Sequence, residues 1–140
     1  MLHIFRIENG VLREKDTVSI LPTLADDASW IDLVDSEENE RELVQQFLEA
    51  ELPASDDMEE IEASARFFSD EQGLHVHSLF LFQSEGRART STVAFVVQEG
   101  RLLSFRDSRL PDFRLLRLRV RRGWVKAKQP IDILLSILEQ

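Results

Sequence analysis

Hydrophobic and polar residues alternate over several short stretches of this chain, and a period of two predicts β-strands. The alternation begins with LHIFRI at residues 2–7 and resumes at residues 11–15, so the intervening Asn9-Gly10 pair predicts a tight hairpin turn. Residues 16–28 contain a proline and two adjacent aspartates and predict a loop. WIDLV at residues 30–34 then predicts a third short strand.

A second block of the chain predicts a β-meander. Its four strand-like runs are residues 65–68, 73–82, 90–98 and 101–106, and residues 70–73, 84–89 and 99–100 are expected to separate them. Residues 79–82 (LFLF) are apolar in succession, which predicts a strand covered on both faces.

Helical periodicity appears in four other stretches. They are residues 36–52 with Ser36 as the N-cap, residues 55–62, residues 110–122 with Pro111 near the start, and residues 129–140 with Pro130 in the first turn. Residues 116–121 (LRLRVR) also alternate like a strand, but we favour a helix that Gly123 ends. No stop signal follows Leu138, so we expect the last helix to continue beyond the sequence.

Elements in this order predict an α/β fold. We expect a mixed, largely antiparallel β-sheet of about six to seven strands sandwiched between helices (α/β/α), with residues 1–140 forming a single domain.

The charge is large and unevenly distributed. The net charge of −9 argues against general nucleic-acid binding. Residues 1–72 carry −15 and residues 73–140 carry +6, so the two halves are expected to attract each other or their neighbours in an assembly.

The chain contains no cysteine, which excludes disulfides and thiolate metal sites. It shows no signal-peptide pattern and no apolar run of the roughly 18 residues that cross a bilayer, so we expect it to be soluble as it stands. No hydrolase or phosphate-loop motif is present either, and we expect no enzymatic activity.

Two groups of residues have ambiguous chemistry. His75 and His77 would point to one face of a strand, where they could hold zinc, but no third ligand can be placed and a half-covered strand face is the favoured interpretation. The arginines of residues 114–122 are compatible with a solvated helix face, a phosphate-binding surface or a contact with anionic lipid. We favour a fourth interpretation, a contact with the acidic half of a neighbouring subunit.

Residues 35–62 hold twelve acidic side chains and one basic one. The acids up to Glu51 fit a solvated helix face that complements the helix dipole. The remaining five repel one another within seven residues, and hard cations such as Mg²⁺ or Ca²⁺ relieve that repulsion, although composition alone favours a solvated face. They are Asp56, Asp57, Glu59, Glu60 and Glu62.

Several segments together strongly resemble the N-terminal cytoplasmic domain of the CorA magnesium/cobalt transporter family. They are WIDLV (30–34), MEEIEASARFF (58–68), GLHVHSLFLF (73–82), STVAF (91–95), GRLL (100–103) and LPDFRL (110–115). The resemblance implies a homopentameric channel for Mg²⁺ and Co²⁺ in which this domain lies at the cytoplasmic face of the inner membrane. It also implies a stalk helix and two transmembrane helices with a Gly-Met-Asn signature, none of which is present in these 140 residues.

The same resemblance implies a regulatory role. In the family, divalent cations bound between cytoplasmic domains hold the channel closed, and the acidic pair that contributes corresponds here to Glu59 and Glu60. The expected ligand is weakly bound regulatory Mg²⁺, with Co²⁺ as a second possibility. Ser136 occupies a position that is acidic in relatives, so this chain supplies part of a site. The alternatives are the related zinc-transporter branch, or a standalone scaffold or ligand-binding module.

Overall fold

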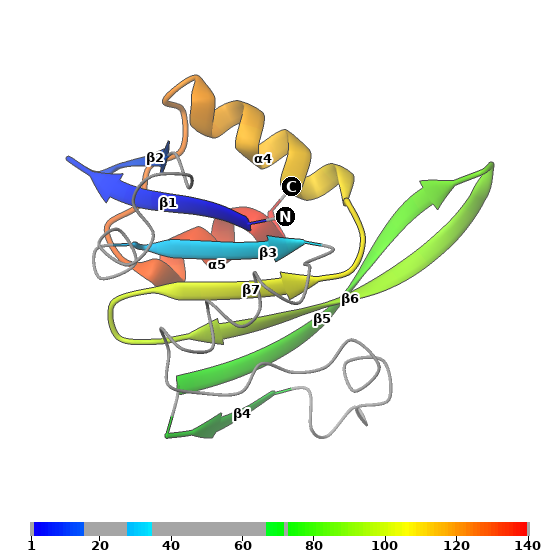
Figure 1. Ribbon diagram of the computed structural model, residues 1–140, viewed down its shortest axis with the longest axis horizontal. Coiled ribbons are helices and arrows are strands. Elements are labelled where there is room, and N and C mark those ends of the chain that lie inside the picture. The colour runs from blue at the N-terminus through cyan, green and yellow to red at the C-terminus, as the bar shows by residue number, and fades with distance from the viewer. Residues whose placement is uncertain (1, 16–27, 35–66, 72, 140) are drawn as a thin grey trace.

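The computed structural model describes residues 2–15, 28–34, 67–71 and 73–139 (Figure 1). These residues form one seven-stranded sheet in the order β2-β1-β3-β7-β6-β5-β4, together with two helices. The strands are β1 (Leu2–Glu8), β2 (Val11–Lys15), β3 (Trp30–Val34), β4 (Phe67–Asp70), β5 (Gly73–Ser84), β6 (Arg87–Val97) and β7 (Leu102–Arg106). The helices are α4 (Pro111–Arg121) and α5 (Pro130–Leu138).

Every strand pair in this sheet is antiparallel except β3 and β7, which run parallel. The prediction of a mixed, largely antiparallel sheet is therefore confirmed. The predicted helices over residues 36–52 and 55–62 lie outside the described residues.

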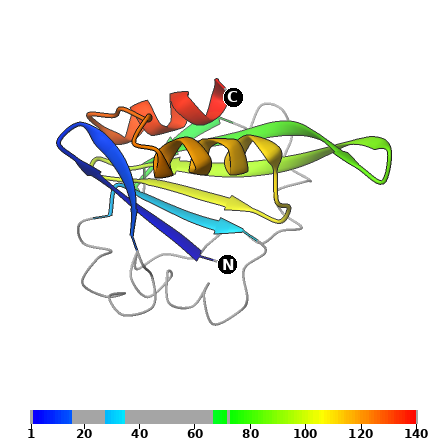
Figure 2. The ribbon, with the colours of Figure 1, turned by 90° about the horizontal axis from the view of Figure 1, so that it is seen from above.

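Two hydrophobic clusters lie on opposite faces of the sheet. Neighbouring residues of a central strand point to opposite sides, as Trp30 and Ile31 or Leu102 and Leu103 do, and each pair is divided between the two clusters. Helices α4 and α5 cover one face, where Phe113 packs among the buried aromatic rings of the strands (Figure 2). Burial of these strands on both faces explains their near-continuous apolar sequences.

The helix prediction for residues 110–122 is confirmed, and the alternative strand at 116–121 is wrong. Pro111 occupies the first turn of α4, and Phe113, Leu116 and Val120 recur at helical spacing and are buried against the sheet. The final helix is also confirmed, with Pro130 in its first turn and a capping box between Gln129 and Asp132.

The predicted turn at Asn9-Gly10 is confirmed, since both residues have positive φ values of 53° and 77°. The loop expected over residues 84–89 is wrong. Strands β5 and β6 continue to a two-residue turn at Glu85-Gly86, with φ values of 54° and 75°, because Gly86 adopts the left-handed conformation that such a turn requires.

This extension makes the β5–β6 hairpin project beyond the rest of the sheet (Figure 1). Strand β4 pairs with β5 only as far as Val76, and β7 pairs with β6 only from Ala94 onward. The prediction that residues 79–82 are covered on both faces is wrong. Phe80 is buried, whereas Leu79 is 51% and Leu81 is 74% exposed, because their side of the projecting hairpin faces away from the core.

Candidate functional site

A row of buried polar side chains joins the two parallel strands beneath α4. Asp32 of β3 lies opposite Ser104 of β7 and has no exposed surface. Ser104 Oγ donates to Asp32 Oδ1 at 2.7 Å, while Arg106 donates from Nε to Oδ1 at 3.2 Å and from Nη2 to Oδ2 at 2.8 Å. The carboxylate therefore accepts three hydrogen bonds, two of them from a buried cation.

The partners of Asp32 are themselves held in place. Trp30 Nε1 donates to Ser104 Oγ at 2.9 Å, and Arg106 Nη1 donates to the carbonyl oxygen of Ser108 at 3.0 Å. The Arg106 guanidinium carbon lies 3.9 Å from the ring centroid of Phe113 on α4. This network links the sheet to the helix layer and fixes the direction of Arg106.

A second ion pair joins the N-terminal hairpin to α4. Arg117 Nε and Nη2 each lie 2.9 Å from Glu14 Oε1, and both side chains are about a quarter exposed. His3 Nδ1 lies 4.0 Å from the same oxygen. Burial lowers the pKa of His3, and the positive charge of Arg117 lowers it further, although Asp32 and Glu14 act in the opposite direction. Both ion pairs connect the acidic and basic halves of the sequence.

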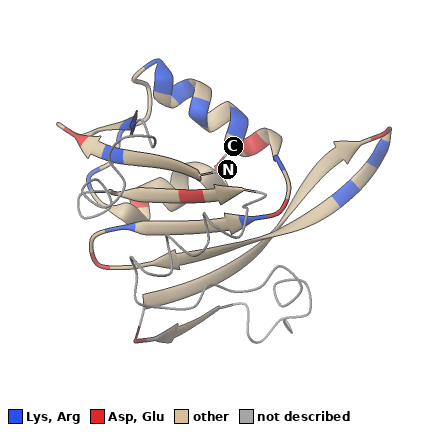
Figure 3. Cartoon of the chain, viewed as in Figure 1, with Lys and Arg blue, Asp and Glu red and all other residues tan. Residues whose placement is uncertain are grey.

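A small cavity of about 170 Å³ opens where β3 and β7 end. Its lining residues come from β1, β3, β7, the β7–α4 connection and α4, and they are His3, Val34, Arg106, Arg109, Leu110, Arg114 and Arg117. Four of the seven are arginines. Figure 3 shows that basic residues recur along α4 and the segment that follows it.

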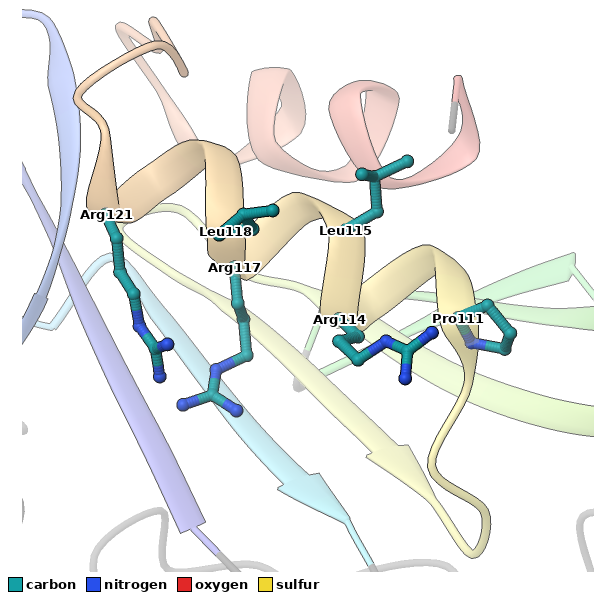
Figure 4. A pocket seen from close by; sticks show the side chains of 6 residues that line it. All are labelled: Pro111, Arg114, Leu115, Arg117, Leu118 and Arg121. Carbon is teal, nitrogen blue, oxygen red and sulfur yellow. The ribbon is translucent and has the colours of Figure 1, made fainter.

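A larger groove of about 480 Å³ runs along the outer side of α4, and Arg114 and Arg117 line both it and the cavity. Figure 4 shows three arginines, Arg114, Arg117 and Arg121, projecting to one side of the helix, while Leu115 projects toward α5. Leu115 is 41% exposed and Leu118 is 44% exposed. The groove therefore combines basic and apolar side chains.

A zinc site at His75 and His77 would need a third ligand. In the part of the chain that the structure describes, no group of three or more potential metal-binding side chains occurs. Both imidazoles are buried on the same face of β5, and the Phe68 ring stacks on His75 with centroids 4.4 Å apart. Among the described residues, these contacts fit histidines packed on a covered strand face.

The proposed sensor residues Glu59 and Glu60 lie outside the described residues, as do Asp56, Asp57 and Glu62. Their metal-binding role stays a prediction. Ser136 is described, and its Oγ donates to the carbonyl oxygen of Asp132 at 3.0 Å, one turn earlier in α5.

The Asp32–Arg106 pair was not predicted from the sequence. A signal was present, since a single aspartate interrupts the apolar run WIDLV and a buried carboxylate requires a partner. Its partner lies 74 residues further along the chain and could not be identified from local pattern.

The fold matches solved structures of transporter domains. One is described as the complete structure of the CorA magnesium transporter from Methanocaldococcus jannaschii, with a TM-score of 0.71 and 14% identity, covering 99% of this chain and 43% of that one. Another is the ZntB cytoplasmic domain from Vibrio parahaemolyticus, with a TM-score of 0.67 and 12% identity, covering 98% of this chain and 55% of that one. The chain therefore has the CorA soluble-domain fold.

Sequence comparison identifies the family. The family model described as "CorA-like Mg2+ transporter protein" matches residues 25–140. The magnesium transport protein CorA of Escherichia coli K12 is 41% identical over 140 residues, which span 99% of this chain and 44% of that protein. The chain belongs to the CorA-like Mg²⁺ transporter family. Neither α4 nor α5, the two helices that the structure describes, is long and apolar enough to cross a membrane.

Proposed function

We propose that this chain is the cytoplasmic, Mg²⁺-sensing domain of a CorA-type channel for Mg²⁺ and Co²⁺. The observation that carries the proposal is the 41% identity to the E. coli magnesium transport protein over nearly the whole chain. The chain spans less than half the length of that relative, and the proposal assigns conduction to segments outside these 140 residues. In this assignment the domain lies at the cytoplasmic face of the inner membrane and assembles with four further copies as a pentamer.

The proposed sensing mechanism follows from electrostatics. Carboxylates brought together from neighbouring subunits repel one another, and a bound divalent cation removes that repulsion. The cation therefore binds the closed assembly more tightly than the open one, and its binding shifts the population toward closure. Glu59 and Glu60 supply this chain's share of the carboxylates. Mg²⁺ suits the role because it keeps much of its water and is released when its concentration falls.

The experiment is a chimera in which this chain replaces the segment of the E. coli protein that it matches. Mg²⁺ uptake is measured as the cytoplasmic Mg²⁺ concentration is raised. We expect Glu59→Gln with Glu60→Gln to leave transport active but to shift its inhibition to higher Mg²⁺. The matched control is Glu49→Gln with Glu51→Gln, which removes the same charge from the stretch predicted to be a solvated helix face. Unchanged Mg²⁺ inhibition in the first double variant removes these two residues from the mechanism.

The zinc-transporter branch is the second candidate, supported by the fold likeness to the ZntB domain. At 12% identity that likeness concerns the fold alone, whereas the 41% identity favours the magnesium branch. Comparing Mg²⁺, Co²⁺ and Zn²⁺ uptake by the longer protein that carries this domain separates the two. Uptake of Zn²⁺ alone would replace the magnesium assignment. A standalone scaffold module has no specific observation in its favour.

A further inference from the structure

The arginine-lined cavity at the ends of β3 and β7 has an uneven charge balance. Two of its arginines are neutralised by carboxylates, because Arg106 pairs with Asp32 and Arg117 pairs with Glu14. The other two, Arg109 and Arg114, make no ion pair with any residue that the structure describes. Among the residues that the structure describes, the cavity lining therefore holds two arginines without a carboxylate partner, in a protein whose net charge is −9.

The paired arginines form a preorganised wall. Arg106 is held by Asp32, by the carbonyl oxygen of Ser108 and by the ring of Phe113, so its guanidinium has a fixed direction. A guanidinium that is already fixed loses little conformational freedom when an anion approaches. Arg109 and Arg114 are exposed and can turn toward a ligand.

Other features of the cavity favour an anion. His3 is buried at the wall and its imidazole can donate one hydrogen bond. Leu110 lines the cavity and is the N-cap of α4, so the positive end of the helix dipole adds to the field of the arginines. Asp112 lies in the first turn of α4 and opposes this contribution, but it is not among the lining residues.

The size of the cavity limits the ligand. At about 170 Å³ it is smaller than pockets that enclose drug-sized molecules, which are roughly 300–1,000 Å³, and it suits a single compact group. Guanidinium groups match the geometry of phosphate oxygens and bind them through paired hydrogen bonds. Because Arg114 and Arg117 also line the groove along α4, the remainder of a larger ligand can lie against Leu115 and Leu118.

We propose that this cavity is a phosphate-binding site in which Arg109 and Arg114 contact the anion, while Arg106 and Arg117, held by Asp32 and Glu14, form its fixed wall. The site is independent of the divalent-cation sensor proposed above and shares no residue with it. The phosphate belongs either to a free anion or to a lipid headgroup, and the experiment separates these sources.

The first arm titrates the chain with pyrophosphate at low salt, with heat or amide chemical shifts as the readout. We expect saturable binding that weakens about tenfold in Arg109→Gln and in Arg114→Gln, since each loses a charge-assisted contact. The matched control is Arg119→Gln, which removes the same charge from an exposed position of α4 outside the cavity. We expect the control to keep the affinity of the unmodified chain.

The second arm measures sedimentation with vesicles of phosphatidylglycerol or of phosphatidylcholine. Binding of pyrophosphate with the expected variant pattern supports the site and assigns it to a free anion. Binding only to phosphatidylglycerol vesicles, lost in Arg109→Gln and Arg114→Gln and kept in Arg119→Gln, supports it and assigns it to a lipid. The proposal is overturned if neither probe binds, or if Arg119→Gln weakens binding as much as the cavity variants, since the effect would then be one of general charge. Urea unfolding of each variant checks that the exposed substitutions leave the fold intact.

Discussion

Replacing Asp32 by asparagine removes one buried negative charge and almost no volume. The carboxylate accepts one hydrogen bond from Ser104 and two from Arg106, whose side chain is only 4% exposed. Asparagine cannot neutralise that guanidinium, and the surrounding structure holds Arg106 in place through Ser108 and Phe113. The substitution therefore leaves a cation buried without its counter-charge.

The expected cost is large for a domain of this size. Breaking a buried ion pair by removing one partner costs about 3–5 kcal/mol. The whole free energy of unfolding of such a domain is about 5–15 kcal/mol, so Asp32→Asn removes a substantial part of it. With a urea dependence of about 2 kcal/mol per molar, the midpoint of unfolding should fall by about 2 M.

The measurement is urea unfolding followed by tryptophan fluorescence, since Trp30 donates to Ser104 in the same network. The control is Glu14→Gln, which breaks a partly exposed pair with Arg117 and should cost about 0–1 kcal/mol. Asp32→Leu with Arg106→Met should cost less than the sum of the single changes, because it removes both charges together. An Asp32→Asn cost as small as that of Glu14→Gln would refute the assignment of a desolvated pair.

Two further predictions concern exposure and pH. Leu81→Gln on the projecting hairpin should change the free energy of unfolding by at most about 0.5 kcal/mol, because Leu81 is exposed. Phe80→Ala should lower it by about 3–5 kcal/mol, because Phe80 is buried. Equal losses for the two variants in urea unfolding would mean that both faces of the hairpin are covered. Because the pKa of His3 in the folded protein lies below its ordinary value of 6.5, the unfolded chain takes up the proton first as the pH falls. The free energy of unfolding should therefore decrease as the pH falls below about 6.5, and the decrease should be smaller in His3→Gln. Thermal unfolding measured across this pH range checks the prediction. Identical pH profiles for the variant and the unmodified chain would exclude His3 as a source of the decrease.

The pattern of apolar, turn-forming and helix-starting residues predicted most of the described strands and helices, because such elements depend mainly on residues close together in the sequence. The Asn9-Gly10 turn requires two residues that tolerate positive φ, and α4 is specified by Pro111 together with a helical apolar stripe. The pattern failed in the β5–β6 hairpin. An apolar run indicates a buried strand only when neighbouring elements cover both its faces, and Leu81 lies beyond the strands that flank the rest of the sheet.

The candidate sites were predictable to a smaller extent, because they depend on contacts between distant parts of the chain. The arginines of α4 were conspicuous in the sequence, but the pairing of Arg117 depends on Glu14 of β2. The pairing of Arg106 on β7 likewise depends on Asp32 of β3. The cavity also needs the end of β3 to meet the end of β7. For Glu59 and Glu60 the family resemblance remains the only guide.

The parallel pairing of β3 with β7 has a consequence for how the chain folds during synthesis. Strand β1 finds β2 across a two-residue turn, and β5 finds β6 in the same way, so both hairpins can form from local contacts. Trp30, by contrast, pairs with Leu102 and must wait until more than seventy further residues have left the ribosome. Until then β3 exposes an unpaired apolar edge. The buried hydrogen bonds that Ser104 and Arg106 donate to Asp32 can form only after β7 is complete, so the centre of the sheet closes late in synthesis.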